Sequence, residues 1–461
     1  MDLESKNDNT EDLKETVNNN GVFVGLDIGT TKIVCLVGKK NEHGKLEILG
    51  YGKSKSLGVK RGVVANIVQT IESIETALKE AKEKTNIDIN DVAVGIAGQH
   101  IRSMQHIDYI IREDSEKYID SEDTERLVSN VKKLKLEPGE EIIHVLAQEY
   151  KIDNESNILE PEGMCGSKLE ANFHVVAGQI SAMNNITRCV QNAGLNVADI
   201  HLEPLASLEA TVTEEERDAG VVLIDIGGGT TDIAIFKDKI IRHTAVIPFG
   251  GNIITNDIKE GCSIIEKQAE QLKLKFGSAL PSQNNENEIV SIPGLKGHEP
   301  KEISIKNLSK IIRARLEEIL NDVNKEIRLY QDSNHQRNKL IAGIVLTGGG
   351  ANLKHIKQLC EYVTGMPTRI GFANEYLAHN SPDELSSPIY ATSVGLVLRY
   401  MNKKTMTPKP PISDPPIPGT QVEKDFFGVW AEKFLTGAGK LGSLFANENN
   451  NENNNENNND K

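Results

Sequence analysis

The sequence predicts an α/β protein made of two similar domains that face each other, and a repeated hairpin carries this prediction. An apolar strand at 22–28 ends in the turn Gly29-Thr30-Thr31 and returns as a second apolar strand at 33–37. The same order of apolar strand, acidic residue, glycine-rich turn and paired threonines recurs at 221–236. The two copies lie about 200 residues apart, which is too far for a solenoid repeat and indicates two duplicated domains.

Helices are expected between and after these strands. Apolar residues recur at helical spacing behind Asn66, which is a favourable residue for a helix N-cap. A helical region is expected at 252–276, where Ser263 followed by Glu266 predicts a capping box. Residues 282–300 are polar and predict a loop, whereas apolar residues at helical spacing predict a long amphipathic helix at 311–327.

The composition argues against several classes of protein. The chain has 461 residues, with 52 Lys and Arg against 67 Asp and Glu, and a formal net charge of −15. Nucleic acid is a poor partner for such a chain, because phosphate backbones are bound by clustered Lys and Arg. The 5 cysteines are scattered and form no C-x-x-C pair, which argues against a disulfide framework or a zinc site. No apolar run reaches the ~18 residues of a membrane span and the N-terminus is polar, so a cytosolic protein is expected.

The repeated turn has the chemistry of a phosphate site. Glycine and threonine bring backbone N–H groups and hydroxyls close to an anion. The acid at the end of each strand, Asp27 or Asp225, can hold Mg²⁺ through water. One such turn alone is more often an ordinary hairpin turn. Two copies followed by a third glycine-rich turn at 348–350 favour a clamp on the phosphates of a nucleotide.

The two hairpins and the third turn, in this order, resemble the actin-like ATPase superfamily over residues 21–400. The resemblance implies an actin-like fold, in which two duplicated RNase H-like domains enclose a nucleotide cleft that binds ATP and Mg²⁺. Asp27 and Asp225 would share the metal. The remaining nucleotide contacts implied by the resemblance are Gly29, Thr30, Thr31, Lys32, Gly227, Gly228, Gly229, Thr230, Thr231, Gly348, Gly349 and Gly350.

Further site residues follow from the same resemblance. Glu203 opens one of the two helices that connect the domains, the other being at 391–395, and is the candidate for positioning the attacking water. Asp225 is the second candidate catalytic acid, in a protein expected to be at most a weak ATPase. Glu270 and Lys273 lie one helical turn apart and share a face. By resemblance they contact ribose and adenine, although a solvated charged face would show the same pattern.

Within the superfamily, the chain resembles the FtsA family of bacterial cell-division proteins. Lys32 directly after Thr-Thr, the run at 247–255 and an extra region at 89–170 carry this resemblance. It implies filaments on the cytoplasmic face of the membrane at the division site, which tether the tubulin-like FtsZ ring. The inserted subdomain would recruit later division proteins. The implied domains are 21–88 with 171–208, the FtsA-type insertion 89–170, and 209–400 with 253–330 as its outer subdomain.

The two ends of the chain differ in composition from the rest. Residues 1–20 and 447–461 are polar and Asn-rich and predict disorder, and 401–423 predicts a Pro-rich linker. At 424–446 apolar residues at helical spacing predict an amphipathic helix that binds lipid, as the family resemblance also implies. A helix that docks on its own globular part would show the same pattern. The lipid-contacting residues would be Phe426, Phe427, Trp430, Phe434, Leu441, Leu444 and Phe445.

Other members of the superfamily are alternatives to a cell-division protein. A pilus-assembly actin homologue can carry the inserted subdomain but normally lacks the terminal helix. A chaperone-type ATPase needs a large substrate domain after residue 400, where the sequence is short and mostly polar. A small-molecule kinase needs a substrate site that no motif in the sequence specifies. The cell-division function is therefore favoured.

Overall fold

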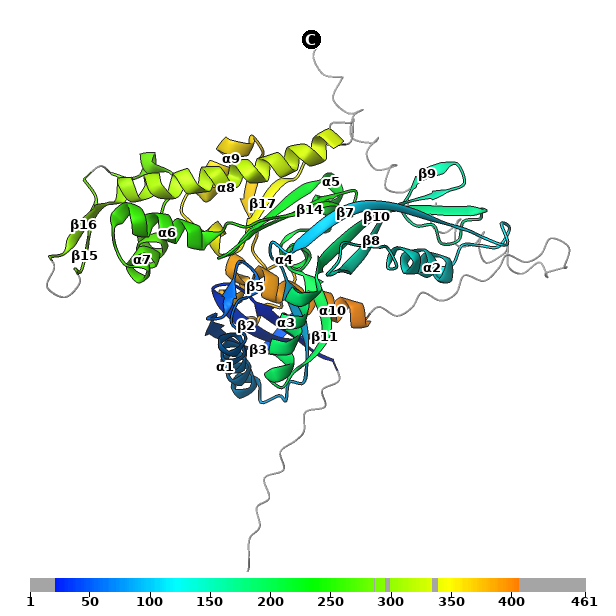
Figure 1. Ribbon diagram of the computed structural model, residues 1–461, viewed down its shortest axis with the longest axis horizontal. Coiled ribbons are helices and arrows are strands. Elements are labelled where there is room, and N and C mark those ends of the chain that lie inside the picture. Colours follow the sequence, from blue (N-terminus) through cyan, green and yellow to red (C-terminus); the bar gives the residue numbers. More distant parts are fainter. Residues whose placement is uncertain (1–20, 286, 295–298, 334–338, 406–461) are drawn as a thin grey trace, which may run out of the picture. The chain divides into compact units, whose positions relative to one another are not determined.

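The computed structural model describes residues 21–285, 287–294, 299–333 and 339–405 (Figure 1). The predicted disordered ends at 1–20 and 447–461 and the predicted membrane helix at 424–446 lie outside the described residues. The same is true of the predicted linker from residue 406 onward.

The two predicted domains each contain a five-stranded sheet of the same topology. In each, three antiparallel strands are followed by two parallel ones, and the predicted duplication is therefore confirmed. The first sheet has the order β11-β6-β1-β2-β3, with bounds Asn196–Leu202, Asp91–Ile96, Val22–Ile28, Lys32–Lys40 and Leu46–Lys55. The second has the order β14-β13-β12-β17-β18, with bounds Ile240–Ile247, Thr231–Lys237, Val221–Ile226, Gly343–Thr347 and Thr368–Ile370.

Helices cover both faces of both sheets. On the first sheet, α1 (Ile67–Thr85) and α3 (Ile180–Asn192) pack on one face and α10 (Ala391–Thr405) on the other. Both faces are thus buried, which explains why β1 and β2 are almost continuously apolar. On the second sheet, α4 and α5 lie on one face and α8 and α9 on the other, with bounds Glu203–Thr211, Glu214–Ala219, Ile305–Ser333 and Ile356–Thr364.

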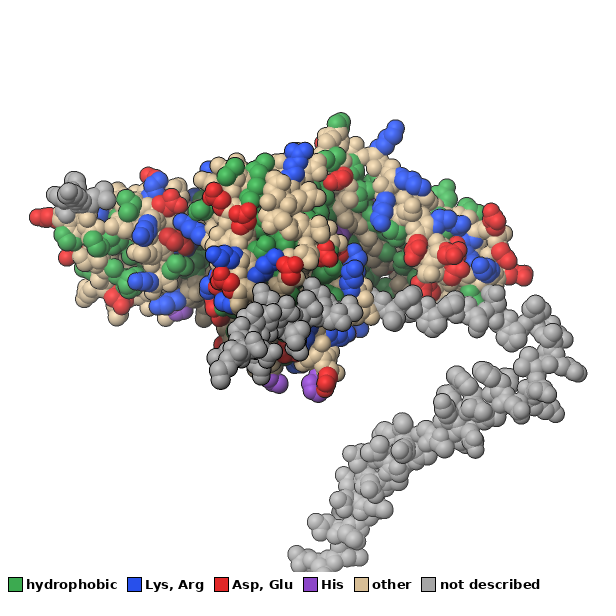
Figure 2. Space-filling view, turned by 90° about the horizontal axis from the view of Figure 1, so that it is seen from below, with side chains coloured by type: hydrophobic (Ala, Val, Ile, Leu, Met, Phe, Trp, Pro, Cys, Tyr) green, Lys and Arg blue, Asp and Glu red, His purple; other side chains and the backbone are tan. Residues whose placement is uncertain are grey.

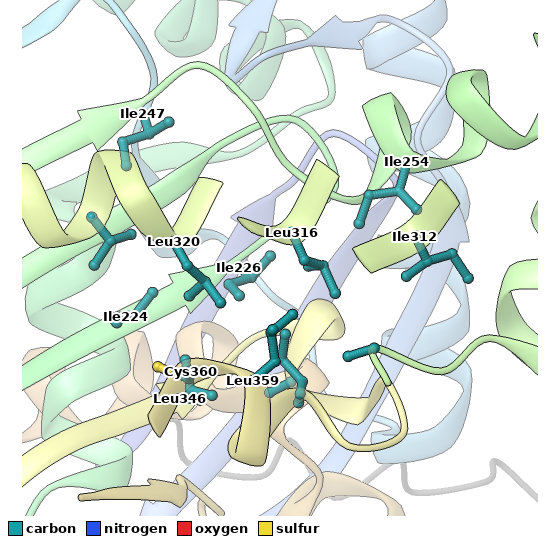
Figure 3. Close-up of a cluster of buried hydrophobic side chains, with 14 of the residues drawn as sticks. Ile224, Ile226, Ile247, Ile254, Ile312, Leu316, Leu320, Leu346, Leu359 and Cys360 are labelled. Atoms are coloured by element: carbon teal, nitrogen blue, oxygen red, sulfur yellow. The ribbon is translucent and has the colours of Figure 1, made fainter. Parts of the chain in front are cut away.

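The core of the second domain forms between its sheet and α8 (Figure 3). Ile312, Leu316 and Leu320 recur every four residues on α8 and are fully buried against Ile226 and Leu346 of the sheet. This spacing places the three side chains on one helix face, as the sequence predicts. Truncation of one of them, such as Leu316→Ala, is expected to cost about 2–5 kcal/mol of unfolding free energy.

The inserted subdomain has its own four-stranded sheet, of order β7-β10-β8-β9, and its own core beneath α2 (Ser121–Val131). It also docks on the second domain. Ser103 Oγ donates to the Thr244 carbonyl of β14 at 2.8 Å, and His174 Nε2 lies 2.9 Å from Thr244 Oγ1. The strands are Ile101–Ile111, Lys168–Gln179, Glu140–Ile152 and Glu155–Ile158.

Three local expectations are corrected by the structure. The predicted capping box is wrong: Ser263 has φ 48° and ends α6 (Gly251–Cys262) in a left-handed turn, and α7 (Glu266–Phe276) starts without a side-chain cap. The predicted loop at 282–300 contains the strand β15 (Ile289–Ile292), which pairs with β16 (Lys301–Ser304) just after the predicted loop. Residues 401–405, expected in the linker, belong to α10. In contrast, the Asn66 cap is confirmed, since its side chain accepts from Gln69 N.

The remaining described elements are short. The hairpin β4–β5 (Val59–Lys60 and Val63–Val64) precedes α1. The 3-10 helices of the described chain are Pro281–Gln283, Gly349–Asn352, Asp383–Ser386 and Pro388–Tyr390. On the face shown in Figure 2, Lys and Arg side chains are interspersed with Asp and Glu.

Candidate functional site

The turns of the two repeated hairpins lie tip to tip. A Cβ atom built on Gly228 would lie 2.3 Å from Thr31 Cγ2, and one on Gly229 would lie 2.6 Å from Thr30 Oγ1. Only glycine allows so close an approach, which is the reason for the glycine-rich sequence of the second turn. The glycines and threonines of the two turns are thereby brought to one place, as the duplicated motif predicts.

The acid at each strand end is buried and held by hydroxyl groups. Asp27, 5% exposed, accepts a hydrogen bond from Ser393 Oγ of α10 at 2.8 Å. Asp225, 7% exposed, accepts from Ser207 Oγ of α4 at 2.6 Å and from Thr392 Oγ1 of α10 at 3.2 Å. The two connecting helices therefore fix both carboxylates.

These helices cross at unusually close range. A Cβ built on Gly395 of α10 would lie 1.7 Å from the carbonyl oxygen of Ala206 on α4, so Gly395 cannot be replaced without separating the helices. The sequence places these helices where the two domains meet, and the structure agrees, because α10 packs on the first sheet and α4 on the second.

Glu203 lies close enough to the two aspartates for their charges to act on it. A Cβ on Gly95 would lie 2.9 Å from Glu203 Cγ, so the glycine makes room for this side chain. Burial and the carboxylates of Asp27, Asp232 and Asp225 raise the pKa of Glu203, and the cation of Lys32 opposes them. A carboxyl group with a raised pKa can carry a proton, which is a property of general acids and bases. Its part in positioning water stays a prediction.

Asp232 is a further acid beside the second turn, and it is not among the site residues predicted from the sequence. It is buried beside Asp225, its direct cross-strand partner in the β12–β13 hairpin. Its Oδ2 accepts from Thr230 Oγ1 at 3.0 Å, whereas its buried Oδ1 has no hydrogen-bond partner. Burial and the Asp225 charge raise the pKa of Asp232 to about 8. Counting the hairpin register from the turn would have placed it opposite Asp225.

Lys32 lies at the start of β2 but is anchored away from the turns. Its Nζ donates to the carbonyl oxygen of Ile389 at 2.7 Å and lies 5.5 Å from the centre of the Tyr390 ring. The charge of Lys32 lowers the pKa of Asp225, against the larger effect of burial, which raises it. Lys32 therefore connects the first turn to the segment that leads into α10.

The third glycine-rich turn packs against the end of the second hairpin. Gly348 has φ 80°, and its Cβ would lie 2.2 Å from Asp225 Oδ1. A Cβ on Gly350 would lie 2.4 Å from Ile226 Cγ2. Gly349 differs from both, since nothing lies within 4 Å of its Cβ position. Gly348 and Gly350 are thus needed by the fold, while Gly349 faces open space.

Glu270 and Lys273 lie near the second turn and form an ion pair with 2.8 Å between Nζ and Oε2. Lys273, 9% exposed, also donates to the Gly251 carbonyl at 2.9 Å and to Thr255 Oγ1 at 2.8 Å. Gly251 N in turn donates to the Gly227 carbonyl at 2.9 Å. The pair is therefore more than a solvated charged face, and its contact with a nucleoside stays a prediction.

The oxygen donors at the two strand ends fit Mg²⁺ held through water. Mg²⁺ prefers carboxylate oxygens and keeps several of its waters. Asp27 and Asp225 supply such oxygens, and the unpartnered Oδ1 of Asp232 is an acceptor that a bound water could use. Within the described residues, no group of three His, Cys, Asp or Glu converges closely enough to bind a metal directly.

Known proteins resemble this chain in sequence and in fold. The family described as "Cell division protein FtsA" matches residues 222–395, and the "SHS2 domain inserted in FTSA" matches 98–177. The cell division protein FtsA of Pseudomonas aeruginosa is 39% identical over 392 residues, covering 85% of this chain and 92% of its own length. That of Escherichia coli (strain K12) is 33% identical over 379 residues, covering 82% and 89%.

Among solved structures, the "PilM-PilN type IV pilus biogenesis complex" superposes with a TM-score of 0.61 at 16% identity, covering 82% of this chain and 98% of that chain. At this identity the likeness shows a shared fold alone. The expected actin-like fold with its inserted subdomain is thereby confirmed. The relatives, matched over most of their length at more than 30% identity, settle the family. This chain belongs to the FtsA family of cell-division proteins.

Proposed function

We propose that the chain binds Mg-ATP between its two domains and, in that state, assembles into filaments that tether the FtsZ ring to the cytoplasmic membrane. The observation that carries the nucleotide part is the contact between the two turns, Gly228 against Thr31 and Gly229 against Thr30. Phosphates held there would be bound by both domains at once. Nucleotide binding would therefore fix the angle between the domains, which is what a filament requires of its subunits.

Gly349 provides the test of nucleotide binding. A valine side chain there meets no protein atom within 4 Å of its Cβ, so Gly349→Val should keep the unfolding temperature of the parent. It would fill the space proposed for adenosine and should reduce ATP affinity at least ~10-fold, because a steric overlap with the ligand must be relieved. Isothermal titration with Mg-ATP measures this.

Asn352→Val is the matched control, since Asn352 is exposed on the same 3-10 helix and receives the same side chain. Its ATP affinity should equal that of the parent. Normal ATP binding by Gly349→Val would show that the base lies elsewhere.

Membrane attachment is proposed from family membership and the apolar residues at 424–446. Among the described residues, no helix is long and apolar enough to cross a bilayer. One in-plane helix binds lipid weakly, and a filament that presents many of them gains ~10²–10⁴-fold by avidity. Recruitment to the membrane should therefore follow polymerisation.

Flotation with liposomes tests the attachment, and FtsZ added to the same tubes tests the tether. Trp430→Glu should abolish flotation of the chain and of FtsZ, whereas Asn450→Glu, outside the apolar segment, should leave both unchanged. Equal flotation of Trp430→Glu and the parent would exclude this segment as the anchor. Flotation of the chain without FtsZ would exclude the tether alone.

The inserted subdomain is proposed to bind later division proteins. The site residues named above come from the two duplicated domains and the helices between them, which leaves the sheet β7-β10-β8-β9 outside the nucleotide site. Its deletion should leave ATP binding intact and abolish recruitment in a pull-down with those proteins.

A further inference from the structure

The turn of the small β4–β5 hairpin has a left-handed backbone. Arg61 and Gly62 are both left-handed, with φ of 49° and 73°. Apart from Lys239, the other described non-glycine residues with positive φ are Asn, Asp, Ser or His, most of which have short polar side chains suited to this conformation. Two-residue hairpin turns adopt this conformation at both central positions, as the Asp238–Lys239 turn between β13 and β14 also does, so the turn is regular and fixes the backbone position of Arg61.

The surroundings of this turn are the two phosphate turns. Gly62 N donates to Thr30 Oγ1 of the first turn at 3.2 Å. A Cβ on Gly229 of the second turn would lie 2.8 Å from Arg61 Cα. On its other side the turn meets the start of the inserted subdomain, because a Cβ on Gly62 would lie 2.6 Å from the Ala97 carbonyl oxygen. The backbone of Arg61 is therefore fixed at the junction of both turns.

Arg61 lies where the terminal phosphate of a bound nucleotide would be. The glycine-rich turn at 348–350 contacts the strand end at Asp225 and Ile226. The β4–β5 turn contacts the turn tips instead, through Gly62 at Thr30 and through the Arg61 backbone at Gly229. Suppose that a nucleotide places its base at the 348–350 turn and its phosphates between the two hairpin turns. Its terminal phosphate would then point toward Arg61.

A phosphate bound near these acidic residues would need a cation beside it. Asp27, Asp225, Asp232 and Glu203 are acidic, and the Lys32 ammonium already donates to a backbone carbonyl. The Arg61 side chain is exposed, and its guanidinium forms no hydrogen bond or ion pair with the residues that the structure describes. Guanidinium binds phosphate with two parallel hydrogen bonds, which gives both affinity and orientation.

We propose that Arg61 binds the terminal phosphate of a nucleoside triphosphate and so makes the chain distinguish triphosphate from diphosphate. The proposal rests on the proposed nucleotide site. It adds a residue outside the three glycine-rich motifs, and it makes the β4–β5 turn the part of the first domain that senses whether the terminal phosphate is present.

Arg61→Gly separates this function from a structural one. Glycine adopts the left-handed conformation without strain, so the variant should fold with an unfolding temperature no lower than that of the parent. Its affinity for a non-hydrolysable Mg-ATP analogue should fall ~10–100-fold, the range of a charge-assisted hydrogen bond. Affinity for Mg-ADP should change less than ~2-fold, because ADP lacks the phosphate in question.

Lys60→Ala is the matched control, because Lys60 is an exposed cation next to Arg61 whose loss changes the net charge equally. It should retain the parent's preference for triphosphate. An unchanged preference in Arg61→Gly, or an equal loss of both nucleotides, would overturn the assignment of Arg61. A parent chain that binds neither nucleotide would instead overturn the proposed function itself, and titration of the intact chain distinguishes these results.

Discussion

The two hairpins of the duplicated domains have the same register but different chemistry. In each hairpin one residue pair flanks the turn: Ile28 lies opposite Ile33 in the first and Ile226 opposite Thr231 in the second. The residue opposite Asp27 is Val34, whereas the residue opposite Asp225 is a second acid, Asp232. The duplication thus preserved the strand geometry and one carboxylate at each strand end. The second hairpin additionally carries an acid with one oxygen bonded to Thr230 and the other without a hydrogen-bond partner.

Exchanging these two partners should produce the largest effect. Val34 is fully buried among apolar residues, so Val34→Asp places an unpaired carboxyl group in a core and should cost about 3–5 kcal/mol of unfolding free energy. Asp232→Val, which copies the first hairpin, removes a buried oxygen without a partner but also the acceptor of the Thr230 hydroxyl, and should stabilise the nucleotide-free chain by about 1 kcal/mol. Chemical denaturation at pH 8 measures both changes.

The reciprocal exchange also tests what Asp232 is for. If Asp232→Val gains stability and loses ATP turnover while binding persists, the acid serves the bound nucleotide. A loss of stability in this variant would mean that the carboxyl group supports the hairpin. That is the reverse of what its unpartnered Oδ1 indicates, and it would remove Asp232 from the site.

The second expected effect compares the two acids at the strand ends. Asp225 is held by hydroxyls on both connecting helices and Asp27 by one. Asp225→Ala should therefore weaken Mg-ATP binding by about 10–150-fold, the range for a hydrogen bond to a charged group, and Asp27→Ala by a factor at the lower end of that range. Titration in the presence and absence of Mg²⁺ measures each loss.

The loss of affinity should vanish without Mg²⁺ if the carboxylates act through the metal. Equal losses in both variants would show that the two hairpins contribute equally. Unchanged binding by Asp225→Ala would remove Asp225 from the site.

The sequence predicted what repeats and missed what depends on contacts between distant residues. The hairpins at Asp27 and Asp225 were predictable, because the same local pattern occurs twice and each copy alone predicts a hairpin with an acid beside its turn. The contact of Arg61 with Gly229 joins residues from different domains, and no periodicity encodes it. The capping box at Ser263 failed for a local reason, since the chain needs a left-handed residue between α6 and α7 and that turn outweighs the cap.

The two domains also differ because the first carries an inserted subdomain that contacts β14 of the second domain. His174 of the inserted subdomain is 1% exposed, and its ring lies between Thr244 Oγ1 of β14, at 2.9 Å, and Gln105 Nε2, at 3.4 Å. Burial, and to a smaller degree the nearby His243, lower the pKa of His174 to about 4. The joint therefore contains a histidine that is neutral in the folded protein.

The smallest expected effect follows from this joint. The unfolded chain binds a proton at His174 below pH ~6.5, whereas the folded chain does so only near pH 4, so stability is present above pH 6.5 and is lost as the pH falls toward 4. At pH 5.5 the loss from this residue is about 1.4 kcal/mol. His174→Gln keeps an amide that can bond to Thr244 but does not titrate, and should lose that much less stability than the parent between pH 7.5 and 5.5. His43→Gln, at an exposed histidine, is the control and should follow the parent. Other buried histidines titrate alike in all three chains, so the difference in stability loss between His174→Gln and the parent is due to His174. Parallel curves of stability against pH for these two chains would show that protonation does not loosen this joint.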